Sequence, residues 1–584
     1  MARVTSSQRS LAKKVRKPIH NRSSLQLVKK IPEHLHPLIA TQNSQLYTAI
    51  DHASWRFIQL LSRDFFPNYA HQVYLDGLEA TGISKDHIPS ISDMDRKLQR
   101  FGWRAVPVVG FIPPNAFLEF LSLAILPIAC DMRRLDHLSY TPAPDIVHEA
   151  AGHAPILADP SYANYLKHYG EFARKVIFSD KDMDLYNAIR KLSDVKEDPS
   201  SSNKDIQKAQ EELDKASSAV IEISEATQLS RMGWWTFEYG LVGTLKNPKI
   251  YGAGLLSSVA EGYHAMSSAV KKVPMSLDCI NVSYDITKPQ PQLFVTPDFD
   301  FLTEVLFEFA NTLAYKKGGV EGLEKAIRCG TVNTAELNTG LQISGKFCEA
   351  VRDDWGRVCY IRTEGPTQLA YQDRELSGHG PSYHAQGFGS PVGKYKETKI
   401  KDKIRLEFDS GVAVEGRLLS KTKKNNKTLL LSFKDCTVKK DNRVLFAPEW
   451  GTFDMAIGQE VKSVFGGPAD SEHFISATGG FKPSKGQKSN LTPDNKELNT
   501  LYAQIRKLRE TGPDNLMPVL KQVHQKLNLN HKNDWLLRFE ILELTAREDV
   551  RDNQLVSEIK QELKAISQSS KDKAELIERG LALL

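Results

Sequence analysis

The sequence predicts a mainly α-helical protein in which a large helical domain is followed by a small β-rich domain and a C-terminal helical segment. Residues 32–345 carry apolar residues at helical spacing, interrupted by Pro and Gly loops. Residues 394–485 instead carry short alternating runs such as Ile404–Phe408, with Asn425-Asn426 as a turn. From 490 to 584 the helical spacing returns, at Leu498, Leu501, Ile505 and Leu508.

The first 31 residues form a basic segment. They hold nine Lys and Arg and no acidic residue, whereas the rest of the chain has 68 basic and 71 acidic residues. The net charge of +6 therefore belongs to this segment, and nucleic-acid binding by the folded body is not expected. We expect 1–31 to be a flexible tail of a cytoplasmic protein. A mitochondrial presequence is the alternative, which the dense Lys clusters disfavour.

Two further segments interrupt the predicted domains. Residues 180–228 are charged and poor in aromatic residues, and the Pro-Ser run at 198–203 divides them, so they predict a helical hairpin inserted into the large domain. Residues 346–393 include a stretch rich in Gly, Pro and Ser at 378–394 and are interpreted as a linker.

Cysteine and apolar residues exclude several classes of protein. The six cysteines include no CxxC pair, so neither a disulfide framework nor a zinc ribbon is expected. The longest apolar stretch, Phe117–Cys130, is interrupted by Glu119 and Pro127 and is too short to cross about 30 Å of hydrocarbon. We therefore expect no membrane span.

The most informative segment is PAPDIVHEAAGHAP at 142–155. His148 and His153 are five residues apart, which would splay them by about 140° on a continuous helix. Gly152, followed by Pro155, predicts that the helix ends between them, so that His153 can turn back toward His148. A metal site with two histidines is one interpretation, and a capping histidine with a buried core histidine is the other.

Glu238, in RMGWWTFEYGL, is a candidate third ligand. A carboxylate among Trp, Phe, Tyr and Leu is costly to bury unless it binds a cation or is paired. Two imidazoles and one carboxylate are typical of non-haem Fe(II) oxygenases. Zinc on the same ligands would indicate a hydrolase with Glu149 as the base. A scaffold protein with a vestigial metal site is a third hypothesis.

Four blocks carry a resemblance to a known family. TPAPDIVHEAAGHAP (141–155), GWWTFEYGLVG (233–243), YGAGLLSS (251–258) and SYDITKPQP (283–291) follow one another in the chain. In this order they resemble the pterin-dependent aromatic amino acid hydroxylases, over roughly 100–340. The resemblance implies that 32–345 is an iron monooxygenase domain. It would use Fe(II), a tetrahydropterin (tetrahydrobiopterin or a related compound) and O2 to hydroxylate the ring of phenylalanine, tyrosine or tryptophan.

The resemblance also implies residue roles. The iron ligands would be His148, His153 and Glu238. Arg133 would grip the substrate carboxylate, which suits a guanidinium. The substrate wall would comprise Thr141, Pro144, Trp234, Gly254 and Ser257. The pterin would be held by Gly110, Ile112 and Phe117, with Glu149 as a catalytic carboxylate facing it.

The chain departs from the family at several positions. It has Ala150-Ala151 where two bulky aliphatic residues are usual and Tyr239 where Phe is usual, which affects the pocket shape. No N-terminal ACT-like domain is recognisable, and the C-terminal parts match no hydroxylase element. We favour phenylalanine as substrate, as for a phenylalanine 4-monooxygenase, because a compact pocket with Trp234, Tyr239 and Ile286 suits a single ring. Small-molecule partners are expected, with self-association through the C-terminal region.

Overall fold

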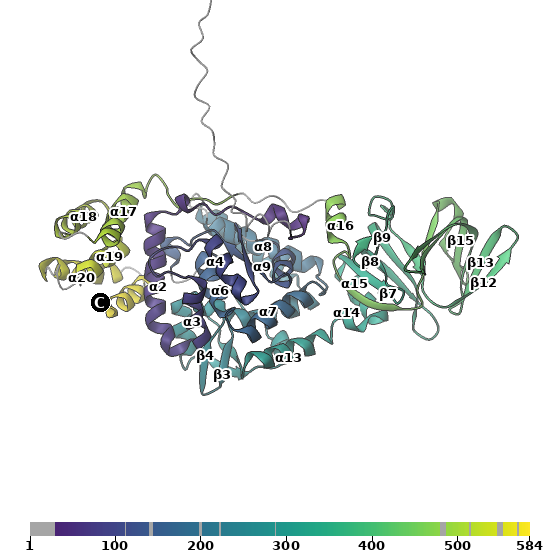
Figure 1. Ribbon diagram of the computed structural model, residues 1–584, viewed down its shortest axis with the longest axis horizontal. Helices are drawn as coiled ribbons and strands as arrows, with labels where there is room; N and C mark the ends of the chain where they lie inside the picture. The colour runs from purple at the N-terminus through teal and green to yellow at the C-terminus, as the bar shows by residue number, and fades with distance from the viewer. Residues whose placement is uncertain are drawn as a thin grey trace, which may run out of the picture.

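Three parts lie along the longest axis of the molecule. The computed structural model describes residues 30–110, 112–138, 144–197, 201–220, 223–286, 288–478, 486–512, 516–545, 553–568 and 571–584. Figure 1 shows a helical body in the centre, a β-rich part on one side and a helical C-terminal part on the other. Residues 1–29 of the predicted tail lie outside the described residues, whereas Ile31 is only 3 % exposed and belongs to a hydrophobic cluster of the body.

The central body is mostly helical. Its longer helices are α2 (Ala49–Tyr69), α3 (Gln72–Thr81), α4 (Ile91–Leu98), α5 (Pro114–Ser122), α7 (Pro160–Ala173), α10 (Glu225–Gly233), α12 (Val259–Met266) and α13 (Phe299–Ala310). Its shorter helices are η1 (Glu33–Leu38), α6 (Ala154–Ile156) and α11 (Ala253–Leu256). The next two helices, α14 (Ala314–Lys317) and α15 (Gly319–Cys329), pack against a sheet of the β-rich part instead (Figure 1). α2 begins at a capping box, because Thr48 and Asp51 satisfy each other's backbone N–H groups.

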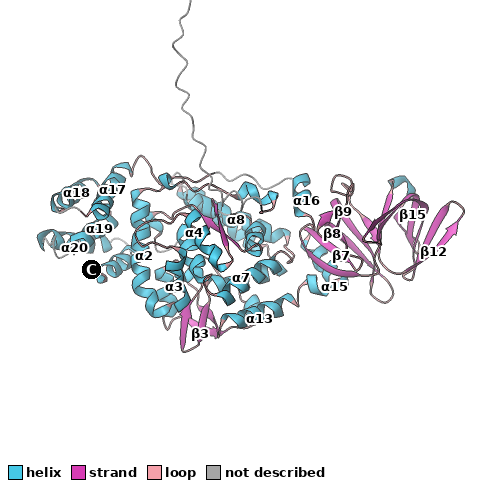
Figure 2. Ribbon diagram, in the orientation of Figure 1, coloured by secondary structure: helices cyan, strands magenta, loops and turns pink. Residues whose placement is uncertain are grey.

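Two small sheets complete the body, so the expectation of a mainly helical domain is confirmed only in part (Figure 2). β1 (Arg104–Val108) and β2 (Ile125–Ala129) pair in parallel. The second sheet has the order β4-β3-β6-β5. Its strands are β3 (Leu241–Thr244), β4 (Asn247–Ile250), β5 (Lys271–Pro274) and β6 (Gln292–Thr296). These strands are only four or five residues long, which makes their alternation hard to detect in the sequence.

A helical hairpin forms at the predicted position. It consists of α8 (Asp180–Glu197) and α9 (Asn203–Ser218), while residues 198–200 between them lie outside the described residues. The two helices bury a small apolar cluster of their own: Ala188, Leu192, Ala209 and Leu213. Lys191 donates across the pair to Glu212, at 2.5 Å.

The β-rich part begins earlier than expected. One sheet consists of β7 (Val332–Leu337), β8 (Leu341–Arg352), β9 (Val358–Tyr371), β10 (Arg374–Glu375), β11 (Gly389–Pro391) and β18 (Val461–Gly466). The prediction of a linker at 346–393 is therefore wrong: β8 and β9 cross it, and Ile361 and Leu369 are at most 1 % exposed. Within that range, the Gly-, Pro- and Ser-rich composition that suggested a linker occurs mainly in the loop between β10 and β11.

The second sheet of this part lies within the predicted β-rich range. It consists of β12 (Tyr395–Ile400), β13 (Lys403–Phe408), β14 (Val412–Lys424), β15 (Lys427–Lys440), β16 (Arg443–Phe446) and β17 (Phe453–Ala456). The Asn425-Asn426 turn is confirmed, because both residues have positive φ (47° and 60°) between β14 and β15. Asn tolerates this conformation well, as hairpin turns require.

The C-terminal helices do not form a separate domain. They are α17 (Lys496–Thr511), α18 (Met517–Asn530), α19 (Leu536–Thr545), α20 (Asn553–Ser567) and α21 (Lys571–Ala582), whereas α16 (Ser471–Thr478) lies beside the β-rich part (Figure 1). Phe57 of α2 makes edge contacts with Trp535 and Phe539, at ring-centroid distances of 4.9 and 5.0 Å. Arg56 binds Glu540 at 3.1 Å. The body and the region 490–584 therefore share one hydrophobic core.

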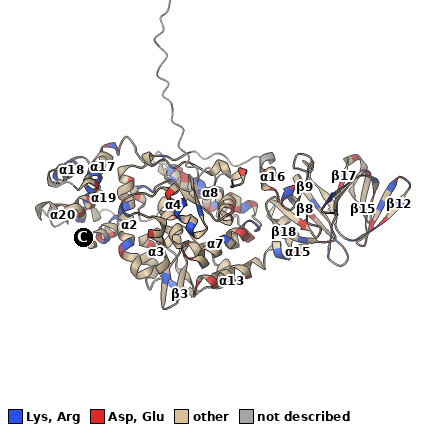
Figure 3. Ribbon diagram, in the orientation of Figure 1, with Lys and Arg blue, Asp and Glu red and all other residues tan. Residues whose placement is uncertain are grey.

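Charged residues of both signs are distributed over all three parts (Figure 3). None of the helices that the structure describes is both long enough and apolar enough to span a bilayer.

Candidate active site

Two π-helical turns carry the three candidate metal ligands. In η5 (Val147–His153) the N–H of Ala154, just past the turn, donates to the carbonyl of Glu149, five residues earlier. Residues five apart therefore lie on one face, and the Nε2 atoms of His148 and His153 are 3.2 Å apart. The predicted end of the helix at Gly152 is wrong. The chain stays helical there, and the change in winding brings the histidines together.

Gly152 serves close packing instead. A Cβ atom at this position would lie 2.8 Å from the carbonyl oxygen of Ala253, in α11. The missing side chain thus allows the turn that carries the histidines to lie directly against α11.

Glu238 completes a triangle of ligand atoms. It ends the second π-helical turn, η6 (Trp234–Glu238), where the N–H of Tyr239 donates to the carbonyl of Trp234 at 2.9 Å. Its carboxylate oxygens lie 3.3 Å from Nε2 of His148 and 3.2 Å from Nε2 of His153. The structure thus brings together residues that are far apart in the sequence.

The triangle has the dimensions and the charge of a cation site. Bonds of about 2.0–2.2 Å to one metal ion place neighbouring ligand atoms about 3–3.5 Å apart, as here. Burial opposes charge on His148, but the Glu238 carboxylate outweighs burial and raises the pKa of His148 to about 9. Burial also opposes charge on Glu238, but the two histidines lower the pKa of that carboxyl group below its usual range.

Arg133 is held rigidly beside this triangle. Its Nε and Nη2 donate to the two carboxylate oxygens of Asp145, both at 2.8 Å, and its Nη1 donates to the carbonyl of Ser257 at 3.2 Å. The side chain is 1 % exposed. A guanidinium has five N–H donors, so the described residues leave one without a partner on each Nη nitrogen. These two donors could bind an incoming carboxylate.

Asp145 and Ser257 also hold His148. The backbone N–H of His148 donates to Asp145 at 3.1 Å, and Nδ1 of His148 lies 3.1 Å from the hydroxyl of Ser257. A partner on the second ring nitrogen fixes the orientation of a ligating histidine. Ser257, predicted as substrate wall, therefore contacts a candidate ligand directly.

Trp234 lies in the middle of an aromatic stack. Its ring is 4.4 Å from that of Tyr239 and 4.3 Å from that of Tyr284, with the latter pair nearly parallel at 7°. Gly254 leaves room for this stack, because a Cβ there would lie 2.7 Å from the Tyr239 ring. Trp234 and Gly254 are both predicted to line the substrate site, and both lie against the ring of Tyr239.

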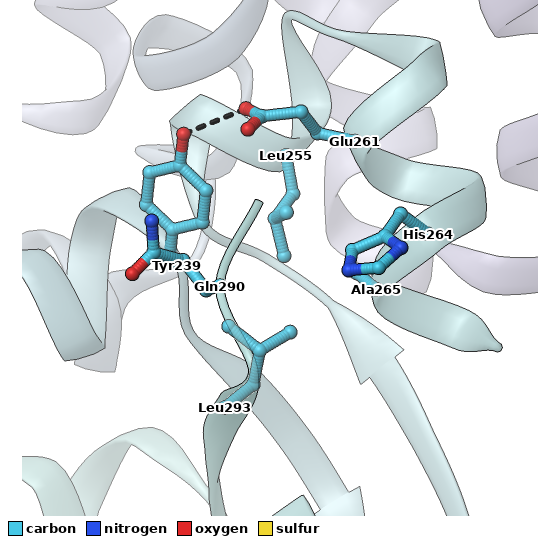
Figure 4. Close-up of a pocket in the computed structure, with 7 residues that line it drawn as sticks. All are labelled: Tyr239, Leu255, Glu261, His264, Ala265, Gln290 and Leu293. Carbon is cyan, nitrogen blue, oxygen red and sulfur yellow. Dashed lines mark hydrogen bonds between the residues drawn. The ribbon is translucent and has the colours of Figure 1, made fainter. Parts of the chain in front are cut away.

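Tyr239 connects the stack to a small cavity. Its hydroxyl donates to the Glu261 carboxylate at 2.6 Å, and burial raises the pKa of Glu261. Figure 4 shows this bond and the residues that line the cavity, which are Tyr239, Leu255, Glu261, His264, Ala265, Gln290 and Leu293. A phenylalanine at 239 would leave this carboxylate without its hydroxyl partner.

Glu149 lies in the η5 turn between the two histidines. A carboxylate oxygen of Glu149 and one ring nitrogen of each histidine lie within 4.8 Å of one another. Its Oε2 is buried without a hydrogen-bond partner among the described residues, and burial raises the pKa of its carboxyl group.

The other predicted residues are spread around the site. Thr141 lies outside the described residues, and Pro144 is half-buried next to Asp145. Gly110 has a φ of +63° and donates its N–H to Asp131 at 2.7 Å. Ile112 packs in a different apolar cluster, with Val108 and Phe120 among others, whereas Phe117 packs against the main core.

Sequence reasoning missed three residues of the site: Asp145, Glu261 and Tyr284. Asp145 lies inside the PAPDIVHEAAGHAP block, three residues before His148, so its position was a usable signal. Glu261 and Tyr284 contact the site only through the tertiary fold.

Comparison with known proteins decides the family. The model of the biopterin-dependent aromatic amino acid hydroxylases matches residues 41–184 and 201–318, which include the whole triangle and Arg133. The central body belongs to this family. The match leaves out residues 185–200, which include most of α8, and also the β-rich and C-terminal helical parts.

Individual proteins are similar to this part of the chain. The hydroxylase body is similar to phenylalanine-4-hydroxylase of Ralstonia nicotianae, with 28 % identity over 274 residues, or 44 % of this chain and 74 % of the relative. It is also 28 % identical to the enzyme of Pseudomonas aeruginosa over 272 residues, or 46 % and 87 % of the two chains. A solved Chromobacterium violaceum phenylalanine hydroxylase, with bound iron(III) and oxidised 7,8-dihydrobiopterin, is 25 % identical. The aligned region is 50 % of this chain and 92 % of the Chromobacterium chain, with a TM-score of 0.37.

Proposed function

We propose that this enzyme hydroxylates the ring of L-phenylalanine to give L-tyrosine, with Fe(II), a tetrahydropterin and O2. The observation that carries the proposal is the triangle of His148, His153 and Glu238, with 3.2–3.3 Å between its atoms, inside the residues that match the hydroxylase family. Two neutral imidazoles and one carboxylate on one face leave other positions of an iron ion open.

In this proposal the cofactors supply the oxidation, and the chain supplies ligands, orientation and exclusion of water. The three ligands would hold Fe(II), and Ser257 would keep the His148 ring in position. Arg133 would bind the substrate carboxylate through its two remaining donors, while Asp145 prevents the guanidinium from turning. Glu149 is a candidate for contact with the pterin, because its buried Oε2 has no other described partner.

Phenylalanine is the substrate that the aromatic stack favours. Trp234 is enclosed by Tyr239 and Tyr284, and Tyr239 is tied to Glu261, so this wall cannot turn freely to admit a larger ring. A rigid wall of aromatic residues suits a single benzene ring more than an indole.

Mass spectrometry of the products tests the proposal. Protein loaded with Fe(II) is given phenylalanine, tyrosine and tryptophan together, with O2 and with or without tetrahydropterin. We expect one oxygen to be added to phenylalanine only when the pterin is present. The variant Glu238→Ala should lose bound iron and turnover, whereas Glu308→Ala, at an exposed position, should keep both. Iron-loaded protein that modifies none of the three amino acids would refute the proposal.

A further inference from the structure

A second group of two histidines and a carboxylate lies in the β-rich part, outside the residues that match the hydroxylase family. His379 and His384 belong to the loop between β10 and β11, and Asp454 to β17 of the neighbouring sheet. Nδ1 of His379 is 3.2 Å from Nε2 of His384 and 4.0 Å from Oδ2 of Asp454. The histidines are five residues apart, as in the first site.

Main-chain hydrogen bonds hold the loop that carries both histidines against β9. The carbonyl of His379 accepts the N–H of Leu369 at 2.9 Å, and the carbonyl of His384 accepts the N–H of Thr367 at 3.1 Å. The loop is closed by the N–H of His384, which donates to Gly380 at 3.2 Å. A loop with this many main-chain bonds presents its two imidazoles in a defined position, as a metal site requires.

Asp454 reaches the histidines from the other sheet. It is 5 % exposed, and the Ser432 hydroxyl donates to its Oδ1 at 2.5 Å. The other oxygen, Oδ2, is the one nearest His379. The Tyr383 hydroxyl also bonds this carboxylate, so two side-chain hydroxyls hold Asp454 in place. Ligating carboxylates are usually held by hydrogen bonds in this way.

We propose that His379, His384 and Asp454 bind a divalent transition-metal ion of the zinc class, which joins the two sheets of the β-rich part. The three candidate ligand atoms lie within 4.8 Å of one another. Metal bonds of about 2.0–2.2 Å require spacings of about 3–3.5 Å between neighbouring ligand atoms, so binding needs a small inward turn of the Asp454 carboxylate. Water can take the fourth position, because His379 is 14 % exposed. The proposed hydroxylase activity plays no part in this inference.

The test uses the full chain with the first site removed. Because Glu149 and the two histidines of that site could still hold an ion, the Glu238→Ala chain used for the test also carries His148→Ala and His153→Ala. This chain is stripped with a chelator, dialysed against micromolar Zn²⁺, and analysed for metal by mass spectrometry. We expect one equivalent of zinc per chain. Adding His384→Gln should abolish binding. Adding His473→Gln should leave one equivalent, because the side chain of this histidine is 59 % exposed and contacts a single carboxylate, Asp470.

Two further measurements separate metal loss from misfolding. Co²⁺ bound to the Glu238→Ala chain should give visible absorption bands that disappear in His379→Gln, a variant at the most exposed of the three ligands. Zn²⁺ should raise the Tm of the Glu238→Ala chain but not of the chain that also carries His379→Gln. If the Glu238→Ala chain binds no Zn²⁺ or Co²⁺, the two imidazoles only hydrogen-bond each other and the proposal is wrong. If the Glu238→Ala chain binds zinc as expected but the iron-loaded wild-type chain hydroxylates none of the three amino acids, only the proposed function is contradicted.

Discussion

At the scale of single residues, Asp145 fixes two functional groups at once. Its carboxylate holds the guanidinium of Arg133 and accepts the backbone N–H of His148. Burial opposes its charge, but Arg133 outweighs burial and lowers the pKa of Asp145 below its usual range. The side chains of Arg133 and Asp145 are 1 % and 4 % exposed, so water cannot replace either partner of this ion pair.

Replacing Asp145 by Asn should therefore be costly. The amide oxygen can still accept from His148, but the buried Arg133 loses its counter-charge. Removing one partner of a buried ion pair typically costs about 3–5 kcal/mol, so we expect a loss of that size in the free energy of unfolding, measured with urea. KM for the amino acid should rise more than kcat falls. Asp136→Asn is the control, because Asp136 is 71 % exposed and 3.6 Å from Arg134. Equal effects of both variants would contradict this account.

The candidate ligands could be identified from residue type and spacing, but their geometry could not. His148 and His153 stand out because two imidazoles and a nearby carboxylate are rare together, and Glu238 stands out among aromatic residues. The position of Asp145 three residues before His148 marks it as a candidate, but its bidentate contact with Arg133, twelve residues earlier, is set by the tertiary fold.

At the scale of elements, both ligand-bearing turns have π-helical winding. Propensity does not distinguish an α-helical from a π-helical turn, since the extra residue is accommodated by tertiary contacts. Here the contact of Gly152 with the carbonyl of Ala253 is one such constraint. The sequence therefore predicted the right pair of histidines with the wrong helix end.

Gly152→Ala should test this constraint. Its Cβ would meet backbone that cannot rotate away, so we expect a loss of about 1–3 kcal/mol in the free energy of unfolding and weaker metal retention. Gly102→Ala is a matched control. Gly102 has a φ of +76° and nothing within 4 Å of an added Cβ, so it should cost about 1 kcal/mol through the backbone alone and leave metal binding unchanged. Unchanged metal binding in Gly152→Ala would argue against the constraint.

The C-terminal helices contain a pH-sensitive ion pair. Burial alone would raise the pKa of Glu562, but hydrogen bonds from Arg538, His524 and Asn528 outweigh it and lower the pKa. The bond from Arg538 is 2.7 Å long. Because the folded-state pKa is lowered, this stabilisation is complete above the unfolded pKa of about 4.3 and is lost as the pH falls through the folded value.

Glu562→Gln should accordingly destabilise the protein at pH 7, by about 1–3 kcal/mol. The gap to the wild type should narrow below about pH 4, where the wild-type carboxylate becomes protonated. Urea unfolding at several pH values measures this difference. Glu558→Gln, at an exposed position on the same helix, should have little effect at any pH. A gap that stays constant down to pH 3 would rule out titration of Glu562 as its cause.

At the scale of the whole molecule, the hydroxylase body and the C-terminal helices share one core. The apolar spacing of 490–584 predicted helices there, and helices are present. Spacing cannot say which partner covers an apolar face, so the contact of α19 with Phe57 in α2 could not be predicted. Likewise, a high content of Gly, Pro and Ser, as at 378–394, occurs both in flexible linkers and in ordered loops held by main-chain hydrogen bonds, so composition could not distinguish the two.

Phe539→Ala should therefore loosen the hydroxylase body as well as α19. Phe539 is 1 % exposed, and truncation of a buried phenylalanine typically costs about 3–5 kcal/mol. Hydrogen exchange should speed up in α2 together with α19. Leu529→Ala is the control, since Leu529 is 75 % exposed. Faster exchange confined to residues after 490 would show that the C-terminal helices are an independent unit.

The shared core also has a consequence for biosynthesis. α2 and α17 pack together although more than 400 residues separate them in the chain. At about 5–20 residues per second, a ribosome needs roughly 20–80 s to deliver the second helix after the first. Throughout this interval Phe57 and its neighbours lack their cover, so the nascent enzyme should depend on chaperones until its last hundred residues emerge.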